Sequence, residues 1–165
     1  MAVTYTSTER KHGILAMLPG ATRIGNGQRW VIQFSDGKRA MLMTSLIDNI
    51  MVKTDVPPPE NAVLSGFKDG VDHVLAVTGT IGSLTAYLIP VEIVENEFRI
   101  RQRKWMDEYP ENRSNTTWSL PNLGTRFAKY KYDIELRAIT PDEAKRRLAV
   151  HFGTTPDKIN IAVTV

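Results

Sequence analysis

The stretch SDGKRAMLMTS, residues 35–45, decides how the fold of this chain is interpreted. Ser35, Asp36 and Gly37 have the composition of a tight turn. The residues that follow fit a β-strand to about Thr44, with Met41 and Met43 on the same face. Both faces of this strand are apolar, which is typical of a central strand buried on both sides. We therefore predict that the two methionines belong to the core.

The same stretch is also compatible with a helix. In RAMLMTSLIDNIMV, apolar side chains recur at helical spacing, at Met43, Leu46, Ile47, Ile50 and Met51. We predict a strand to about residue 44 followed by a helix over residues 45–52. A helix over the whole of residues 39–52 is the alternative.

The rest of the chain alternates between helical and strand patterns. Thr6 and Glu9 have the spacing of a capping box, which predicts a helix at the start. The other predicted elements are strands within 21–34, 71–79 and 84–91, helices over 91–109 and 140–153, a loop with a short strand within 111–122, an uncertain helix near 126–136, and a terminal strand over 157–165. This order predicts an α/β fold, with α+β as the alternative: one domain over residues 1–165, with a mixed central sheet flanked by helices.

Composition limits the class of protein. The chain has 165 residues, 42% hydrophobic and 24% charged, with no cysteine. Disulfides, thiolate catalysis and cysteine-bound metals are thereby excluded. The sequence has no run of 18 apolar residues and no signal-peptide pattern at its start, so we expect a cytoplasmic protein that does not act in a membrane.

Cations are concentrated in parts of the chain. The net charge is +3, and residues 1–53 carry seven Lys and Arg against three Asp and Glu. Lys38 and Arg39 belong to this basic third. A second concentration, RIRQRK, lies in the predicted helix over 91–109, where Arg99 and Arg103 share a face and Lys104 follows. Such patches can neutralise phosphates, although a basic cluster is often only a solvated helix face.

No catalytic, metal or cofactor motif is present. The sequence contains no phosphate-binding glycine loop, no closely spaced histidine pair and no serine nucleophile motif. Asp36, Asp72 and Glu92 fall at predicted turns or strand ends, where a metal-binding acid can be placed. We predict no cofactor, no metal site and no catalytic residue.

The succession of elements resembles the restriction-endonuclease-like fold of the PD-(D/E)XK nuclease superfamily, over roughly residues 7–106. The stretch DGKRAMLMTS matches the family's turn and strand, and LTAYLIPVEIV resembles a later strand with a Tyr-x-x-Pro exit into a helix. In this family the strand carries an acid and a lysine, followed by a helix. Here those positions fall on Met41 and Met43, so the resemblance implies a degenerate member that lacks the metal-binding motif.

These observations predict a non-catalytic nuclease-like domain that binds nucleic acid or a complex acting on it. The candidate nucleic-acid-binding residues are Lys38, Arg39, Arg99, Arg103 and Lys104. One alternative is a divergent metal-dependent endonuclease that uses some of Asp36, Asp72 and Glu92. Another is a protein-interaction or regulatory module of a phage or mobile element, with the C-terminal strand pairing with a partner or a second copy.

Overall fold

The computed structural model describes residues 6–26, 29–54, 64, 67, 70–80, 83–111, 116–134, 145, 148–149 and 153–161. The chain divides into two compact units, residues 1–134 and 135–165, and each is described by itself. The single domain over residues 1–165 therefore stays a prediction. The architecture described below is that of the first unit.

The described residues of the first unit form an α+β fold around a six-stranded mixed sheet. The strand order is β1 (Thr22–Ile24), β2 (Trp30–Gln33), β3 (Arg39–Ser45), β5 (His73–Thr80), β6 (Ser83–Pro90) and β8 (Lys131–Tyr132). β3 and β5 run parallel, and the other neighbouring pairs are antiparallel. The predicted mixed sheet is thus confirmed. The fold class is α+β, which was the alternative prediction, and not α/β.

The strand predicted from residues 35–45 is confirmed as β3, which lies between β2 and β5. The turn before it closes through hydrogen bonds from Phe34 N to Lys38 O (2.9 Å) and from Gly37 N to Phe34 O (3.0 Å). Gly37 has φ +85°, a left-handed conformation that favours glycine. This explains why the Asp-Gly pair stands at the turn.

The helix predicted over residues 45–52 is wrong. Residues 49–53 instead form β4 (Asn49–Lys53), which pairs antiparallel with β7 (Thr117–Pro121) in a separate two-stranded sheet. Ile50 and Val52 are buried and Met51 and Lys53 are exposed, which is the two-residue period of a strand. The apolar side chains that completed the helical pattern, Leu46 and Ile47, are exposed to solvent. The whole-helix alternative for residues 39–52 falls for the same reason.

Three described α-helices accompany the sheets: α1 (Ser7–Ala16), α2 (Val91–Glu108) and α3 (Leu123–Arg126). The predicted capping box opens α1, since Glu9 N donates to Thr6 Oγ1 and Thr6 N donates to the Glu9 carboxylate. Of residues 126–136, predicted as an uncertain helix, the described residues 126–134 instead contain the end of α3, a 3₁₀ turn (Ala128–Tyr130) and β8, and residues 135 and 136 lie outside the described part. No described helix is both long enough and apolar enough to cross a membrane.

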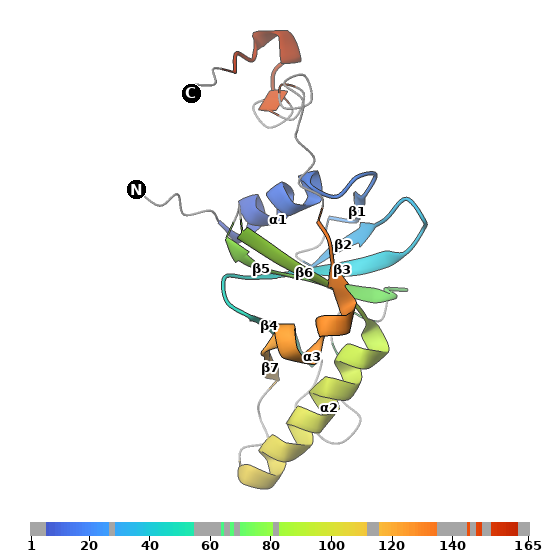
Figure 1. The fold of residues 1–165 in the computed structure, drawn as a ribbon, viewed down its shortest axis with the longest axis vertical. Helices are drawn as coiled ribbons and strands as arrows, with labels where there is room; N and C mark the ends of the chain where they lie inside the picture. The colour runs from blue at the N-terminus through green and yellow to red at the C-terminus, as the bar shows by residue number, and fades with distance from the viewer. Residues whose placement is uncertain are drawn as a thin grey trace. The chain divides into compact units, whose positions relative to one another are not determined.

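The core lies on both faces of the six-stranded sheet. On one face α1 packs against β2, β3 and β5 through residues such as Ile14, Ile32 and Leu42. On the other face, α2 and the β4–β7 pair pack against β5 and β6. Figure 1 shows this arrangement, with α1 on one side of the sheet and α2, β4 and β7 on the other. The predicted burial of this strand on both faces is confirmed for Ala40, Met41 and Leu42, whereas the last three residues of β3 are half-buried.

In the second unit, residues 145 and 148–149 are helical, within the predicted helix over 140–153. Of the predicted terminal strand, residues 157 and 158 belong to a 3₁₀ turn, Pro156–Lys158, and residues 159–161 have no strand pairing. The last four positions, 162–165, lie outside the described residues, so pairing of the C-terminal strand with a partner stays a prediction.

Candidate functional site

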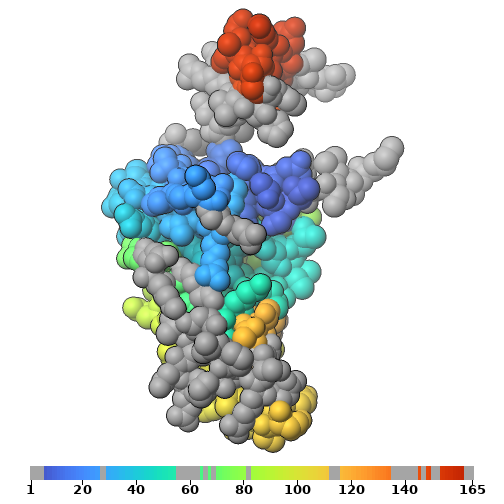
Figure 2. Space-filling model, turned by 180° about the vertical axis from the view of Figure 1, so that it is seen from behind, coloured from blue at the N-terminus to red at the C-terminus, as the bar shows by residue number. Residues whose placement is uncertain are grey.

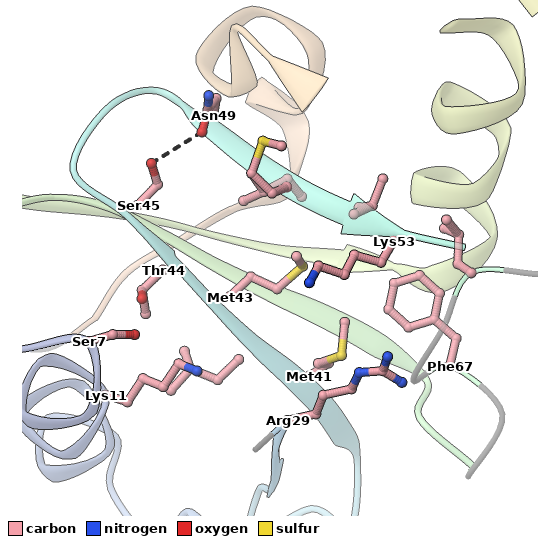
Figure 3. Close-up of a pocket in the computed structure, with 15 residues that line it drawn as sticks. Ser7, Lys11, Arg29, Met41, Met43, Thr44, Ser45, Asn49, Lys53 and Phe67 are labelled. Atoms are coloured by element: carbon pink, nitrogen blue, oxygen red, sulfur yellow. Dashed lines mark hydrogen bonds between the residues drawn. The ribbon is translucent and has the colours of Figure 1, made fainter. Parts of the chain in front are cut away.

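A groove of about 390 Å³ opens beside β3, within the size range of small-ligand sites. It lies between α1 on one side and β4 on the other, and Figure 3 shows its lining side chains. The lining residues are Ser7, Lys11, Arg29, Met41, Leu42, Met43, Thr44, Ser45, Asn49, Ile50, Met51, Val52, Lys53, Leu64 and Phe67.

The pairing of β3 explains why the groove exists. β2 pairs with β3 only as far as the Trp30–Leu42 pair. β3 continues to Ser45, and its last three residues pair only with β5 among the described strands. The side of β3 that β2 leaves uncovered is bordered by α1 and β4, and it forms the wall of the groove.

Methionines form much of the apolar floor. Met41 is buried, Met43 is half-buried against the core, and Met51 comes from the exposed face of β4. Phe67 adds an aromatic ring near Met41, as Figure 3 shows. The prediction that Met41 and Met43 belong to the core is confirmed for Met41 and in part for Met43, which is half-buried against the core; both also line the groove. Methionine is flexible and polarisable, so such a floor adapts to flat ligands.

Three cations border this floor. In Figure 3, Lys53 points from β4 toward Met43, Arg29 points toward Met41 and Phe67, and Lys11 extends from α1 toward β3. No described lining residue is an acid. None of the three cations has an ion-pair partner in the part of the chain that the structure describes. Within the described part of the chain, the positive charge of the groove is therefore not neutralised by a nearby acid.

A fourth cation lies behind the groove wall. The side chain of Arg10 is buried, and its Nη2 donates to Ser45 O (2.6 Å) and to Gly79 O. Burial lowers the pKa of Arg10. These carbonyl oxygens satisfy hydrogen bonds but carry no net negative charge, so Arg10 adds to the positive potential near Ser45.

Lys11 is held in an unfavourable electrostatic environment. Burial lowers its pKa from 10.5, and repulsion from Arg23 lowers it further. A lowered lysine pKa means that folding penalises the charged form. An anion bound in the groove relieves that penalty, which is the behaviour expected of a binding residue.

We expect Lys11→Met to stabilise the protein at pH 7 and so to raise its melting temperature. The gain in the free energy of unfolding should be less than about 1 kcal/mol, because solvent partly screens the half-buried charge. The penalty is present below the lowered pKa and disappears as the pH rises to 10.5, where lysine loses its proton in the unfolded chain as well. The gain should therefore shrink between neutral pH and pH 10.5 in thermal melts. Lys53→Met, an exposed lysine of the same groove, is the control and should change the melting temperature little. A destabilised Lys11→Met variant would contradict the expected penalty.

The residues predicted from sequence to bind nucleic acid lie elsewhere. Lys38 is paired with Asp36 at 2.8 Å, and Arg39 is exposed at the start of β3, where its Nε donates to Gln33. Both are at the end of β3 that β2 covers, and neither lines the groove. The hydrogen bond from Lys38 lowers the pKa of Asp36, and Asp36 raises the pKa of Lys38.

The other three predicted residues, Arg99, Arg103 and Lys104, are exposed on α2. Lys104 lies 3.8 Å from Glu108 and borders a smaller hollow of about 250 Å³, together with Arg101 and Trp105. The structure therefore does not bring the five predicted residues into one site.

Two of the three acids considered for a divergent nuclease form local hydrogen bonds. Asp36 pairs with Lys38, and an Asp72 carboxylate oxygen accepts from Arg39 N (3.1 Å). Glu92 lies in the first turn of α2. Among the described residues there is no group of three or more His, Asp or Glu side chains that can hold a metal ion.

Sequence reasoning identified Met41 and Met43 but missed Lys11, Arg29 and Lys53. The local pattern gave little signal for these three, because each is an ordinary cation in a helix, before a strand or at a strand end. To place Lys53 beside Met43 from the sequence, residues 49–53 would have to be predicted as a strand with Lys53 on its exposed face.

Fold and groove together define an α+β domain with a cationic, methionine-floored groove beside its main sheet. None of the protein-family models, curated proteins or solved structures compared with this chain matches it.

Proposed function

We propose that this protein binds nucleic acid without cleaving it, and that the groove beside β3 holds the phosphate backbone. One observation carries the proposal: Lys11, Arg29 and Lys53 border a groove that has no described acid in its lining. Uncompensated cations on a concave surface attract polyanions, and phosphate contacts by Lys and Arg provide most of the affinity in nucleic-acid binding.

The remaining lining residues suit the same ligand. Ser7, Thr44 and Asn49 offer neutral hydrogen-bond donors of the kind that position phosphates and sugars. Phe67 and the methionines offer an apolar surface on which the face of a base can rest. A groove that combines cations with apolar and aromatic side chains favours single-stranded or locally unpaired nucleic acid, in which bases are accessible.

The chemistry of the floor argues against cleavage at this place. Mg²⁺ requires oxygen ligands, and methionine thioethers are poor ligands for such a hard ion. In the resemblance to PD-(D/E)XK nucleases, Met41 and Met43 occupy the positions of the acid and the lysine. These residues are consistent with a degenerate nuclease-like domain that retains nucleic-acid binding but has lost the catalytic residues.

The test is a binding titration of fluorescently labelled single-stranded, duplex and branched DNA against the full chain, from 50 to 500 mM salt. Three phosphate contacts to a single strand predict a slope of about −2 for the logarithm of the association constant against the logarithm of the salt concentration. Single-stranded DNA should bind more tightly than duplex DNA of the same length.

The same oligonucleotides incubated with Mg²⁺ or Mn²⁺ should remain intact on a denaturing gel. Metal-dependent cleavage would support the divergent endonuclease instead. An absence of binding at 50 mM salt would remove nucleic-acid binding as the function.

A further inference from the structure

The turn between β3 and β4, residues 45–49, presents two large aliphatic side chains to solvent. Leu46 is 69% exposed and Ile47 is 66% exposed, more than any other large hydrophobic side chain in the described part of the chain. Figure 2 shows this part of the chain, in teal, at the surface below α1. Isolated exposed apolar residues are ordinary, but two adjacent ones at the tip of a turn require an explanation.

Hydrogen bonds within the turn fix its backbone. Ile47 N donates to Ser45 Oγ (3.3 Å), and Asn49 N donates to Ile47 O (2.7 Å). Ser45 Oγ also donates to Asn49 Oδ1 (3.2 Å), the hydrogen bond that Figure 3 marks. The tip is therefore held in one conformation before any ligand arrives, which lowers the entropy cost of binding.

The turn is also anchored to the segment that follows β7. Asn122 N donates to Asp48 O (2.8 Å), and Gly124 N donates to the Asp48 carboxylate at 3.3 Å. The carboxylate of Asp48 is thus engaged with the backbone at the start of α3. The tip consequently presents aliphatic surface while its one acid is occupied by a backbone donor.

The turn adjoins the cationic groove. Its two end residues, Ser45 and Asn49, line the groove together with Lys11 and Lys53. Leu46 and Ile47 are not part of the groove lining, but in the chain they lie directly between these two lining residues. Aliphatic side chains inserted between bases unstack them, and proteins use Leu and Ile as such wedges.

We propose that Leu46 and Ile47 form a wedge that separates neighbouring bases of the bound strand, while the groove cations hold its phosphates. This inference rests on the proposed function and adds the class of target: single strands, bulges and mismatched sites, where unstacking costs least. Complementarity of charge between the groove and a polyanion selects a nucleic acid as the occupant.

The experiment uses single-stranded DNA that carries one 2-aminopurine, whose fluorescence rises when the base loses its stacking neighbours. The full chain should raise this fluorescence on binding. The double variant Leu46→Ser with Ile47→Ser should abolish the rise and weaken binding about tenfold, the loss expected for a base that loses its stacking surface. Ile100→Ser, at an aliphatic side chain of α2 that is 53% exposed and outside the groove lining, is the matched control and should change neither quantity.

The outcomes distinguish a failure of the proposed wedge from a failure of the proposed nucleic-acid-binding function. If the parent protein binds DNA and the double variant raises the fluorescence equally, the wedge is overturned and the proposed function stands. If the parent protein does not bind DNA, both fall. If sedimentation shows a dimer of the parent that the double variant dissociates, with unchanged DNA binding, the turn is a contact between copies and the wedge is overturned. Both substitutions are at exposed positions, and circular dichroism verifies that the variants fold.

Discussion

Replacing Lys11, Arg29 and Lys53 together by glutamine is expected to weaken binding to single-stranded DNA about a hundredfold at 0.1 M salt. Each phosphate contact to a single strand contributes about 0.7 to the slope of log affinity against log salt. Three contacts therefore account for about two powers of ten between 1 M and 0.1 M salt. The loss should shrink as the salt concentration approaches 1 M, where counterion release contributes little.

The matched control removes the same charge from another surface. Arg99→Gln, Arg103→Gln and Lys104→Gln together lower the net charge by three, as the groove variant does, but lie on the exposed face of α2. If the groove is the site, this variant should lose less than about threefold, and its salt slope should stay near that of the parent.

The comparison decides between two locations for binding. Equal losses in the two triple variants would mean that DNA responds only to overall charge, which would contradict a site in the groove. A larger loss in the α2 variant would favour the helix predicted from the sequence. Thermal melts of both variants show whether a loss of binding reflects a loss of folding.

Phe98→Ala should destabilise the protein by about 3–5 kcal/mol, the cost of removing a buried aromatic side chain and leaving a cavity. Phe98 is 1% exposed on α2 and packs edge-to-face against Trp118 of β7 at 5.8 Å between ring centroids. It joins α2, the two-stranded sheet and the main sheet in one core. For a chain of this size the melting temperature should fall by roughly 10 °C.

Ile100→Ala, two residues further along the same helix, is the control for Phe98→Ala. Ile100 is 53% exposed, so its truncation should change stability by less than about 0.5 kcal/mol. Denaturant unfolding measures both values. Similar small losses in the two variants would mean that α2 does not pack against the sheets as described.

Local signals in the sequence determined several elements correctly. The capping box at Thr6 and Glu9 placed the first helix, and the Asp-Gly pair placed the turn before β3. The helical pattern over residues 91–109 predicted α2, whose buried face includes Val94 and Phe98. These patterns succeed because caps, turns and amphipathic periods depend on residues close together in the chain.

The segment after β3 shows where local patterns fail. Leu46, Ile47 and Ile50 have helical spacing, yet only Ile50 is buried. The strand forms because β7, far along the chain, supplies the hydrogen-bonding partner for β4. The spacing of apolar residues in a short stretch carries no information about a distant strand that pairs with it in the tertiary structure.

By itself, the sequence determined that this protein is a basic, cysteine-free chain with a central apolar strand that carries Met41 and Met43. The tertiary structure alone decided that these methionines form the floor of a groove and that Lys11, Arg29 and Lys53 border it. The physical reason is that each cation comes from a different element. Their convergence depends on where β2 stops pairing with β3 and on which face β4 turns outward.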